Sequence, residues 1–279
     1  MLTEAQKQQY QRDGYLVLPN FKRPEEIAAL RARAAQIVAD FDPSASSGIF
    51  TTKEQEKRTD DYFLGSDNTI RCFFEEEAFD ANGQLKQDKS LSINKIGHAM
   101  HDLDPVFRTF TCDPQLAALA RDIGLEQVQV WQSMYIFKQP GIGGEVRWHQ
   151  DATYFDTTPI SVTTFWFALE DATLDNGCMW AEPGGHRGPM RERFIRNGDE
   201  IGMEKLDSTP WPDDSRAVPL ECKAGSLICF HGLLPHYSAP NRSAVSRHAY
   251  TLHATDGRTA YSPQNWIQRD AAFPVRGFL

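Results

Sequence analysis

The stretch Val128-Gln-Val-Trp-Gln-Ser-Met-Tyr-Ile-Phe-Lys138 decides the fold class, because β-branched and aromatic residues fill it as they fill buried strands. Four further short runs of this kind follow, and Gly, Pro, Asn and Asp residues separate them. No helical pattern lies between the runs, so parallel βαβ units are not expected. The C-terminal half is therefore predicted to be an antiparallel sandwich or barrel. Its further runs are Val162–Glu170, Cys178–Ala181, Ser226–Phe230 and His248–His253.

Outward from this core, the N-terminal third carries helix signals. A Thr cap, two proline-led starts and two glycine stops mark three helices. A short apolar strand is expected between the first two helices, and a later polar stretch is expected to form a long loop or lid. The predicted elements are helices Thr3–Arg12, Pro24–Asp40 and Asp113–Gly124, a strand Gly14–Pro19 and a loop over residues 42–69.

Composition indicates an ordinary globular protein. The 279 residues are 41% hydrophobic and 24% charged. At this length about three quarters of the unfolded surface is buried on folding, so neither disulfides nor a structural metal is needed for stability. The net charge of −9 argues against nucleic acid as a partner, because phosphates bind basic surfaces.

The sequence also bears on the protein's surroundings. No apolar run reaches the roughly 18 residues of a membrane span, and the N-terminus lacks the basic and apolar regions of a signal peptide. Five scattered cysteines without a C-x-x-C pair argue against zinc ribbons and thioredoxin-like chemistry. We expect reduced thiols, a cytoplasmic location and a small-molecule substrate, with neither nucleic acid nor membrane as a partner. The sequence indicates no oligomeric state.

His149 and Asp151, in the sequence Trp148-His-Gln-Asp151, form the first candidate site. On an extended strand, residues i and i+2 face the same side, about 6.5 Å apart at Cα. The two residues can therefore offer an imidazole nitrogen and a carboxylate oxygen to one metal ion. A second imidazole would complete a face of two His and one carboxylate, with positions left open for substrate and O2. Alone, the motif is more typical of a structural His-Asp pair, so the residues downstream decide.

The second imidazole is expected at His236, 87 residues after the first and just beyond an apolar strand. Arg247 follows 11 residues later, on the next predicted strand. A buried guanidinium that points at a metal pocket is suited to bind a carboxylate through two hydrogen bonds. Ser238 is placed to share that carboxylate.

With these residues in view, the sequence resembles the phytanoyl-CoA dioxygenase family of Fe(II)/2-oxoglutarate-dependent oxygenases. The resemblance covers nearly the whole chain and rests on long strings. They are DGYLVLPNF (13–21), TDDYFLGSDNTIRCFFE (59–75), SINKIGHAMH (92–101), QSMYIFKQP (132–140), GGEVRWHQDA (143–152), LEDATLDNGCMW (169–180), PGGH (183–186), SRHAYTLH (246–253) and YSPQNW (261–266).

The resemblance implies a mainly β fold with flanking α-helices, a double-stranded β-helix or jelly roll. It implies that His149, Asp151 and His236 bind Fe(II). Because ligands this far apart in sequence must converge inside one sandwich, we expect a single domain. This domain spans residues 1–279. Residues 1–125 are expected to form a helical part and lid, and residues 126–279 the jelly-roll core.

The same resemblance implies a co-substrate site. Arg247 and Ser238 match the residues that hold the far carboxylate of 2-oxoglutarate. Further contacts with this co-substrate fall by the same matching on Lys95, Met134 and Trp166.

The implied reaction consumes O2 and 2-oxoglutarate, releases succinate and CO2, and oxidises a C–H bond of a small organic substrate. Asp151 favours hydroxylation, because related halogenases lack a carboxylate at this position. Trp148, where a smaller residue is expected in relatives, and Gln150 are candidates for contacts with the substrate. A CoA thioester is not favoured, since no Lys/Arg cluster is present to bind its phosphates.

Two other functions remain open at this point. A zinc-dependent hydrolase on a cupin-like sandwich would use the same three ligands and a bound water, but it leaves Arg247 without a role. A non-catalytic sensor that binds metal or 2-oxoglutarate would not need an intact ligand set. His231 is a competing second imidazole, less favoured because Gly232 follows it directly and because Arg247 has the family's spacing to His236.

Overall fold

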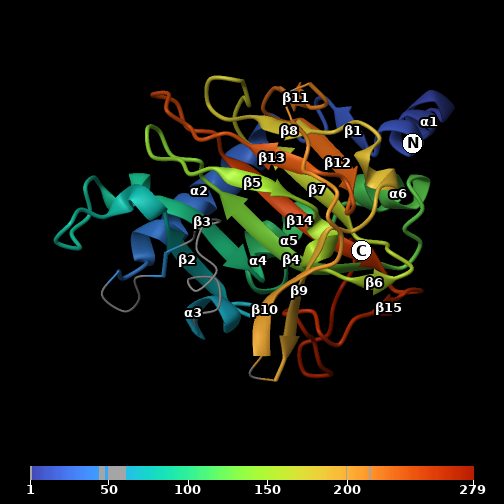
Figure 1. Ribbon diagram of the computed structural model, residues 1–279. Helices are drawn as coiled ribbons and strands as arrows, with labels where there is room; N and C mark the ends of the chain where they lie inside the picture. Colours follow the sequence, from blue (N-terminus) through green and yellow to red (C-terminus); the bar gives the residue numbers. More distant parts are fainter. Residues whose placement is uncertain (1, 44–47, 50–60, 199, 214) are drawn as a thin grey trace.

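The computed structural model describes residues 2–43, 48–49, 61–198, 200–213 and 215–279 (Figure 1). Within these residues no helix is both long and apolar enough to cross a membrane. The α-helices are α1 (Glu4–Asp13), α2 (Pro24–Asp40), α3 (Asp61–Leu64), α4 (Met100–Leu103), α5 (Pro105–Thr111) and α6 (Pro114–Asp122). The strands are β1 (Tyr15–Leu18), β2 (Ile70–Phe74), β3 (Ile93–His98), β4 (Val128–Ile136), β5 (Val146–His149), β6 (Thr157–Thr158), β7 (Thr163–Ala168), β8 (Met179–Ala181), β9 (Glu192–Asn197), β10 (Glu200–Lys205), β11 (Val218–Leu220), β12 (Leu227–His231), β13 (His236–Ser238), β14 (Ala249–Asp256) and β15 (Ala260–Tyr261).

The predicted helices are confirmed, and their termini carry the expected caps. The Thr3 hydroxyl accepts the backbone N–H of Gln6 at the start of α1, and Gly14 ends that helix with φ of 83°. Only a residue without Cβ adopts this backbone conformation readily. Pro24 occupies the first turn of α2, where a missing N–H costs nothing.

A large antiparallel sheet forms the middle layer. In the described residues it has seven strands in the order β1-β12-β7-β14-β4-β3-β2. Strand alternation separates its two faces: Phe165 and Phe167 of β7 belong to a core shared with α2, α5 and α6, whereas Trp166 between them belongs to a second core on the opposite face. The helices therefore back one face of this sheet, and the other face is free to line a site.

A smaller sheet covers that other face. It has the order β11-β8-β13-β5 in the described residues, and all its pairs are antiparallel. Figure 1 shows β5 and β13 lying in front of β7 and β14, with α2, α4 and α5 behind the larger sheet. The two sheets and the helices give three layers, and the predicted sandwich is confirmed.

Two expectations about the N-terminal part need correction. β1 confirms the strand predicted over Gly14–Pro19, but residues 1–125 also supply β2 and β3 to the large sheet, so this part is less helical than expected. The loop expected over residues 42–69 lies largely outside the described residues, at 44–47 and 50–60, and its C-terminal portion forms the short helix α3.

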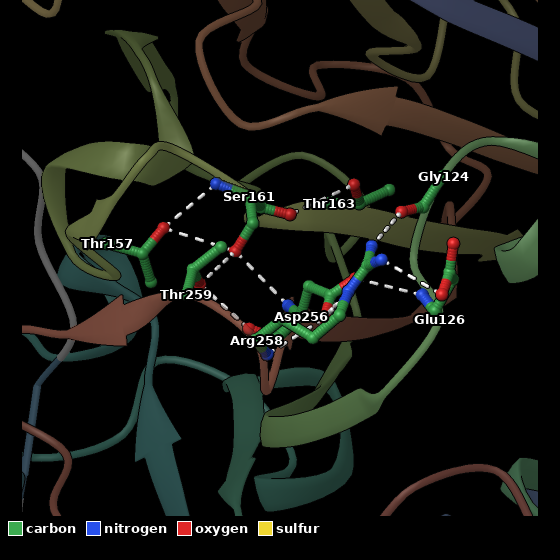
Figure 2. Close-up of polar contacts among 8 residues, drawn as sticks. All are labelled: Gly124, Glu126, Thr157, Ser161, Thr163, Asp256, Arg258 and Thr259. Carbon is green, nitrogen blue, oxygen red and sulfur yellow. Dashed lines mark hydrogen bonds and ion pairs between the residues drawn. The ribbon is translucent and has the colours of Figure 1, made fainter.

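Two further features lie at the ends of the sheets: a projecting hairpin and a cluster of polar contacts. The hairpin β9–β10 projects from one end of the two sheets, at the bottom of Figure 1. At the far end of β14, Asp256 and Arg258 connect the chain before β4 to the segment before β7 (Figure 2). Asp256 accepts the backbone N–H of Glu126 at 2.9 Å and two hydrogen bonds from the Arg258 guanidinium at 3.0 and 2.7 Å.

Candidate metal centre

Strand pairing brings the two predicted imidazoles together. His149 ends β5 and His236 begins β13, and these two residues are direct partners in the antiparallel register. Their ring centroids lie 4.1 Å apart. From the sequence, ligands this far apart were expected to converge inside one sandwich. The structure shows neighbouring strands of one sheet, so backbone hydrogen bonds set the spacing of the two rings.

Asp151 completes the cluster from the turn after β5. Gln150 keeps an extended backbone, so Asp151 still faces the same way as His149, although it already lies in a 3-10 turn (Asp151–Thr153, η4). Its Oδ1 is 3.6 Å from Nε2 of His149 and 3.7 Å from Nε2 of His236. Ligand atoms of the three residues all lie within 4.8 Å of one another, and in the described residues this is the one group of His, Cys, Asp or Glu with such geometry.

Backbone carbonyls orient both imidazole rings. Nδ1 of His149 lies 2.8 Å from the carbonyl oxygen of Arg147, and Nδ1 of His236 lies 3.0 Å from that of Leu234. A carbonyl only accepts, so each Nδ1 carries the hydrogen and each Nε2 keeps a lone pair. Both lone pairs are directed to the space beside Asp151, which is the arrangement that a divalent metal requires.

The protonation states also suit a metal ion. Burial lowers the pKa of His236 to about 4, so its ring is neutral at pH 7. Burial alone would raise the pKa of Asp151, but His236 and His253 beside it hold that pKa well below its usual range. A neutral imidazole and an ionised carboxylate are the forms that bind metal.

The cluster opens into a cavity of about 690 Å³ between the two sheets. This volume is in the range of sites for small organic ligands. The predicted residues that line it are His149, Asp151, His236, Arg247, Ser238, Lys95, Met134, Trp166 and Trp148.

Arg247 lies inside this cavity, two residues before β14 rather than within it. Its side chain is 3% exposed, and its guanidinium lies 3.4 Å from Ser238 Oγ and 5.2 Å from the ring centre of Trp166. Burial lowers the pKa of Arg247 to about 10, which still leaves it charged. Within the described residues no carboxylate lies at ion-pair distance from it, so an anionic ligand would supply the missing charge.

Lys95 and Met134 face the same cavity from β3 and β4, with Nζ of Lys95 3.8 Å from Sδ of Met134. Lys138 was not predicted, yet it lines the cavity as well, near Arg247. Its Nζ donates to the carbonyl oxygen of Gly144 at 2.6 Å. Burial lowers the pKa of Lys138 well below its usual range, and Arg247 nearby lowers it further. In the sequence, only the apolar residues around Lys138 indicated that this lysine is buried.

Gln150 does not join the site, and its expected contact with substrate is corrected. Its side chain is fully buried, and its amide donates to the carbonyl oxygens of Pro189 and Leu233 at 3.0 and 2.8 Å. Trp148 borders the cavity, but its ring stacks on Tyr237 at 5.4 Å. Tyr237 lines the cavity as well, so this stacked pair forms part of the cavity wall.

Sequence reasoning missed two residues that hold Asp151. Thr164 donates its hydroxyl hydrogen to Oδ2 of Asp151, and Nε2 of His253 lies 3.5 Å from the same oxygen. His231, the competing second imidazole, lies elsewhere: its Nδ1 accepts the backbone N–H of Leu233, and its ring is 5.4 Å from that of His186. The period-two alternation of β7 and β14 was the one available signal, since it places Thr164 and His253 on the inner face.

Comparisons with known proteins agree with this geometry. A sequence profile described as phytanoyl-CoA dioxygenase (PhyH) matches residues 10–249. Phytanoyl-CoA dioxygenase of Arabidopsis thaliana is 48% identical over 269 residues, which cover 96% of this chain and 94% of that protein. Phytanoyl-CoA dioxygenase domain-containing protein 1 of Bos taurus is 44% identical over 282 residues, which cover 98% of this chain and 97% of that protein.

A solved structure confirms the fold. The epimerase SnoN in complex with Fe3+, alpha ketoglutarate and nogalamycin RO matches with a TM-score of 0.64, over 98% of this chain and 97% of that chain. The sequence identity is 18%, so this likeness concerns the fold.

Proposed function

This chain belongs to the phytanoyl-CoA dioxygenase family, and on that basis we propose that it is an Fe(II)- and 2-oxoglutarate-dependent dioxygenase. The proposed reaction hydroxylates a C–H bond of a small organic substrate and releases succinate and CO2. The observation that carries the proposal is the cluster of His149, Asp151 and His236, whose ligand atoms lie within 4.8 Å of one another.

Two imidazoles and one carboxylate fit iron in particular. Such a set occupies one face of the metal and leaves positions for a chelating co-substrate and O2. When bound, Fe(II) and 2-oxoglutarate supply the oxidising power: one oxygen atom of O2 enters succinate as CO2 leaves, and the other enters the substrate. The carbonyl contacts at Nδ1 fix both rings, and the pair of contacts at Oδ2 leaves Oδ1 of Asp151 as the ligand oxygen.

We propose that 2-oxoglutarate binds at the Arg247 end of the cavity. Arg247 would pair with the far carboxylate, and Ser238 would donate a hydrogen bond to it, since the two side chains are already 3.4 Å apart. Lys95, Met134 and Trp166 would form the walls around the carbon chain. The epimerase SnoN, which holds Fe3+ and alpha ketoglutarate on the same fold, supports this assignment.

The remaining proposals concern the chain as a whole. We propose that residues 1–279 form one functional domain, because β3 from the N-terminal part supplies Lys95 to a cavity that the C-terminal strands otherwise build. We also propose a cytoplasmic location, which the five free cysteine thiols support.

The first test measures succinate from 2-oxoglutarate and O2 by purified protein loaded anaerobically with Fe(II). Uncoupled turnover without substrate is expected, and His149→Ala and Asp151→Ala should lose it at least about 100-fold. Zinc as the bound metal, with no turnover of 2-oxoglutarate, would overturn the proposal in favour of a hydrolase. Tight binding of 2-oxoglutarate without any succinate would indicate a sensor instead.

The second test concerns Arg247. Replacement by Ala removes a charge-assisted pair that is worth about 1.5–3 kcal/mol, so KM for 2-oxoglutarate should rise by about 10- to 100-fold. Binding of Mn(II), measured by titration, should change little. Arg242→Ala is the matched control, because this exposed guanidinium pairs with Glu77 outside the cavity. An unchanged KM in Arg247→Ala would refute the co-substrate site.

A further inference from the structure

The two ends of the cavity differ in charge. Arg247 and Lys138 line one end. The Lys95 ammonium lies farther along the cavity, 3.8 Å from Sδ of Met134, whose strand partner Thr251 lies between Arg247 and His253. The other end lies near His253, six residues beyond Arg247, which is about 20 Å along an extended strand. A co-substrate anion has its cations at the first end, so the second end is left for the substrate.

Glu192 lines this second end from the hairpin β9–β10. Along β9 it shares a face with Phe194, which is buried and lies 5.8 Å from the ring of Tyr154. Arg193 between them turns away and pairs with Asp156 at 3.3 Å. The backbone N–H of Arg191 donates to Oε1 of Gln150 at 2.9 Å, which places the start of β9 beside the metal cluster.

The Glu192 carboxylate has no cationic partner among the described residues. Arg191 turns toward Glu182, 3.8 Å away, and its guanidinium lies 4.5 Å from the ring centre of Trp211. Lys205 is the register partner of Glu192 across the hairpin, but it is exposed and forms no ion pair with it. A partly buried carboxylate without a partner loses hydration that a bound cation would replace.

The other carboxylate that lines the cavity outside the metal cluster is Glu145, and it behaves differently. It lies close enough to Lys138 to raise the pKa of that amine, so it belongs to the cationic end. Aromatic rings line the cavity beside β9 instead. Phe194 shares the face of Glu192 on this strand, Tyr154 lies beside Phe194, and aromatic faces attract cations.

We propose that the substrate carries a cationic nitrogen, an amine or a quaternary ammonium group, and that Glu192 binds it within these aromatic rings. The proposal rests on the proposed dioxygenase function, because it assigns the Arg247 end of the cavity to the co-substrate. It also argues against a CoA thioester as the substrate, because Glu192 would repel its phosphates at the end where the substrate binds.

The test compares choline with its neutral carbon isostere, 3,3-dimethylbutan-1-ol. Calorimetric titrations use full-length protein loaded with Mn(II) and 2-oxoglutarate without O2, so that no turnover occurs. Choline is expected to bind about 10-fold or more tightly than the alcohol, which corresponds to about 1.4 kcal/mol. Glu192→Gln should abolish this preference, and Glu192→Lys should reverse it.

Glu204→Gln is the matched control, because Glu204 lies on the same hairpin and pairs with Arg193 at 2.7 Å. This variant should keep the preference for choline. Equal binding of the two probes to the wild-type protein would overturn the proposal, as would a preference that survives in folded Glu192→Gln. The outcome is independent of the dioxygenase assignment, which fails only if the Fe(II)-loaded protein forms no succinate.

Discussion

The two oxygens of Asp151 have different partners, and this difference determines how the carboxylate would bind a metal. Oδ1 lies within 3.7 Å of Nε2 in both ligand histidines. Oδ2 accepts the Thr164 hydroxyl and lies 3.5 Å from His253. The carboxylate is therefore already oriented for a single metal bond, and Thr164 is a positioning residue rather than a ligand.

Replacing Thr164 by Val should weaken metal binding by about 10- to 100-fold, the usual effect of removing a group that orients a ligand. The residue keeps its shape, so the fold should persist. Titration with Mn(II) measures the affinity, and the visible absorption band of the anaerobic Fe(II)–2-oxoglutarate complex reports a change in ligand field that a purely structural role would not produce.

Thr251→Val is the control for this experiment. Thr251 lines the same cavity, but its hydroxyl oxygen is buried and has no partner in the described residues. Its removal should leave metal affinity unchanged. A loss of affinity equal to that of Thr164→Val would show that any hydroxyl in this wall matters, and the positioning role would fail.

At this scale the ligands could be predicted and their supports could not. His149 and Asp151 are two residues apart, so strand geometry alone joins them. His236 and Arg247 were candidates because they lie at the ends of predicted strands, and the resemblance to a known family assigned their roles. Thr164 and His253 are ordinary residues of β7 and β14, and their role becomes visible only when both inner faces meet Asp151.

At the scale of elements, polar contacts join the strand ends that flank the site. Ser161 accepts the backbone N–H of Asp256 at 3.1 Å, and its hydroxyl lies 2.9 Å from that of Thr259 (Figure 2). Arg258 binds Asp256 and also reaches the carbonyl oxygen of Gly124 at 3.3 Å. These contacts fasten β14, on which His253 lies, to its neighbours β4 and β7.

Asp256→Asn should destabilise the protein by about 1–3 kcal/mol, because it replaces a buried, charge-assisted pair. Hydrogen bonds from Arg258 hold the pKa of Asp256 well below its usual range. A lowered pKa stabilises the fold above the unfolded value of about 4, and this contribution is lost as the pH falls further. Urea unfolding at pH 7 and pH 3 should therefore show a smaller difference between variant and wild type at pH 3.

Glu126→Gln provides the comparison. Glu126 pairs with the same Arg258 at 2.9 Å, but its side chain is 66% exposed. Its replacement should change the free energy of unfolding by about 0.5 kcal/mol or less. If both variants lose equal stability, burial is not what gives Asp256 its importance.

The elements could be predicted where local chemistry is explicit. A Thr cap and a glycine stop predicted α1, and proline-led starts predicted α2 and α6. Runs of β-branched and aromatic residues predicted β4, β7 and β14. The hairpin β9–β10 was missed because Glu192–Asn197 and Glu200–Lys205 are charged at many positions, and their strand character comes from pairing with each other. β3 joins the large sheet by pairing with β4, and β2 pairs with β3; these pairings could not be read from the local sequence.

At the scale of the whole molecule, the protein is acidic, but cationic side chains line its cavity. The net charge is −9, yet Arg247, Lys138 and Lys95 all line the same cavity. The net charge therefore excluded nucleic acid without describing the site. Burial adds a second global property, because it lowers the pKa of several histidines, among them His98, His231 and His248.

The protein should lose stability between about pH 6.5 and pH 4. Burial lowers the pKa of His231 to about 4, and His186 nearby lowers it further. In this window the unfolded chain binds a proton that the folded protein does not, so a falling pH favours unfolding. From pH 7 to pH 5 this residue should contribute about 1–2 kcal/mol. Urea unfolding of the wild type and of His231→Gln, which should show a shallower dependence, measures the effect.

A dependence that is equally steep in His231→Gln would assign the pH response to other groups. His248, whose pKa burial also lowers to about 4, is the next residue to replace. Its Nδ1 lies 2.8 Å from the Tyr135 hydroxyl, so a Gln replacement can keep that hydrogen bond.

The hairpin β9–β10 has one more consequence, for how new specificities arise. It carries no metal ligand, and it enters the chain between β8 and β11, two strands that pair directly with each other. Sequence changes there leave the pairing of β5 with β13 untouched. A graft of residues 191–206 from a relative should therefore transfer substrate selectivity without rebuilding the metal centre.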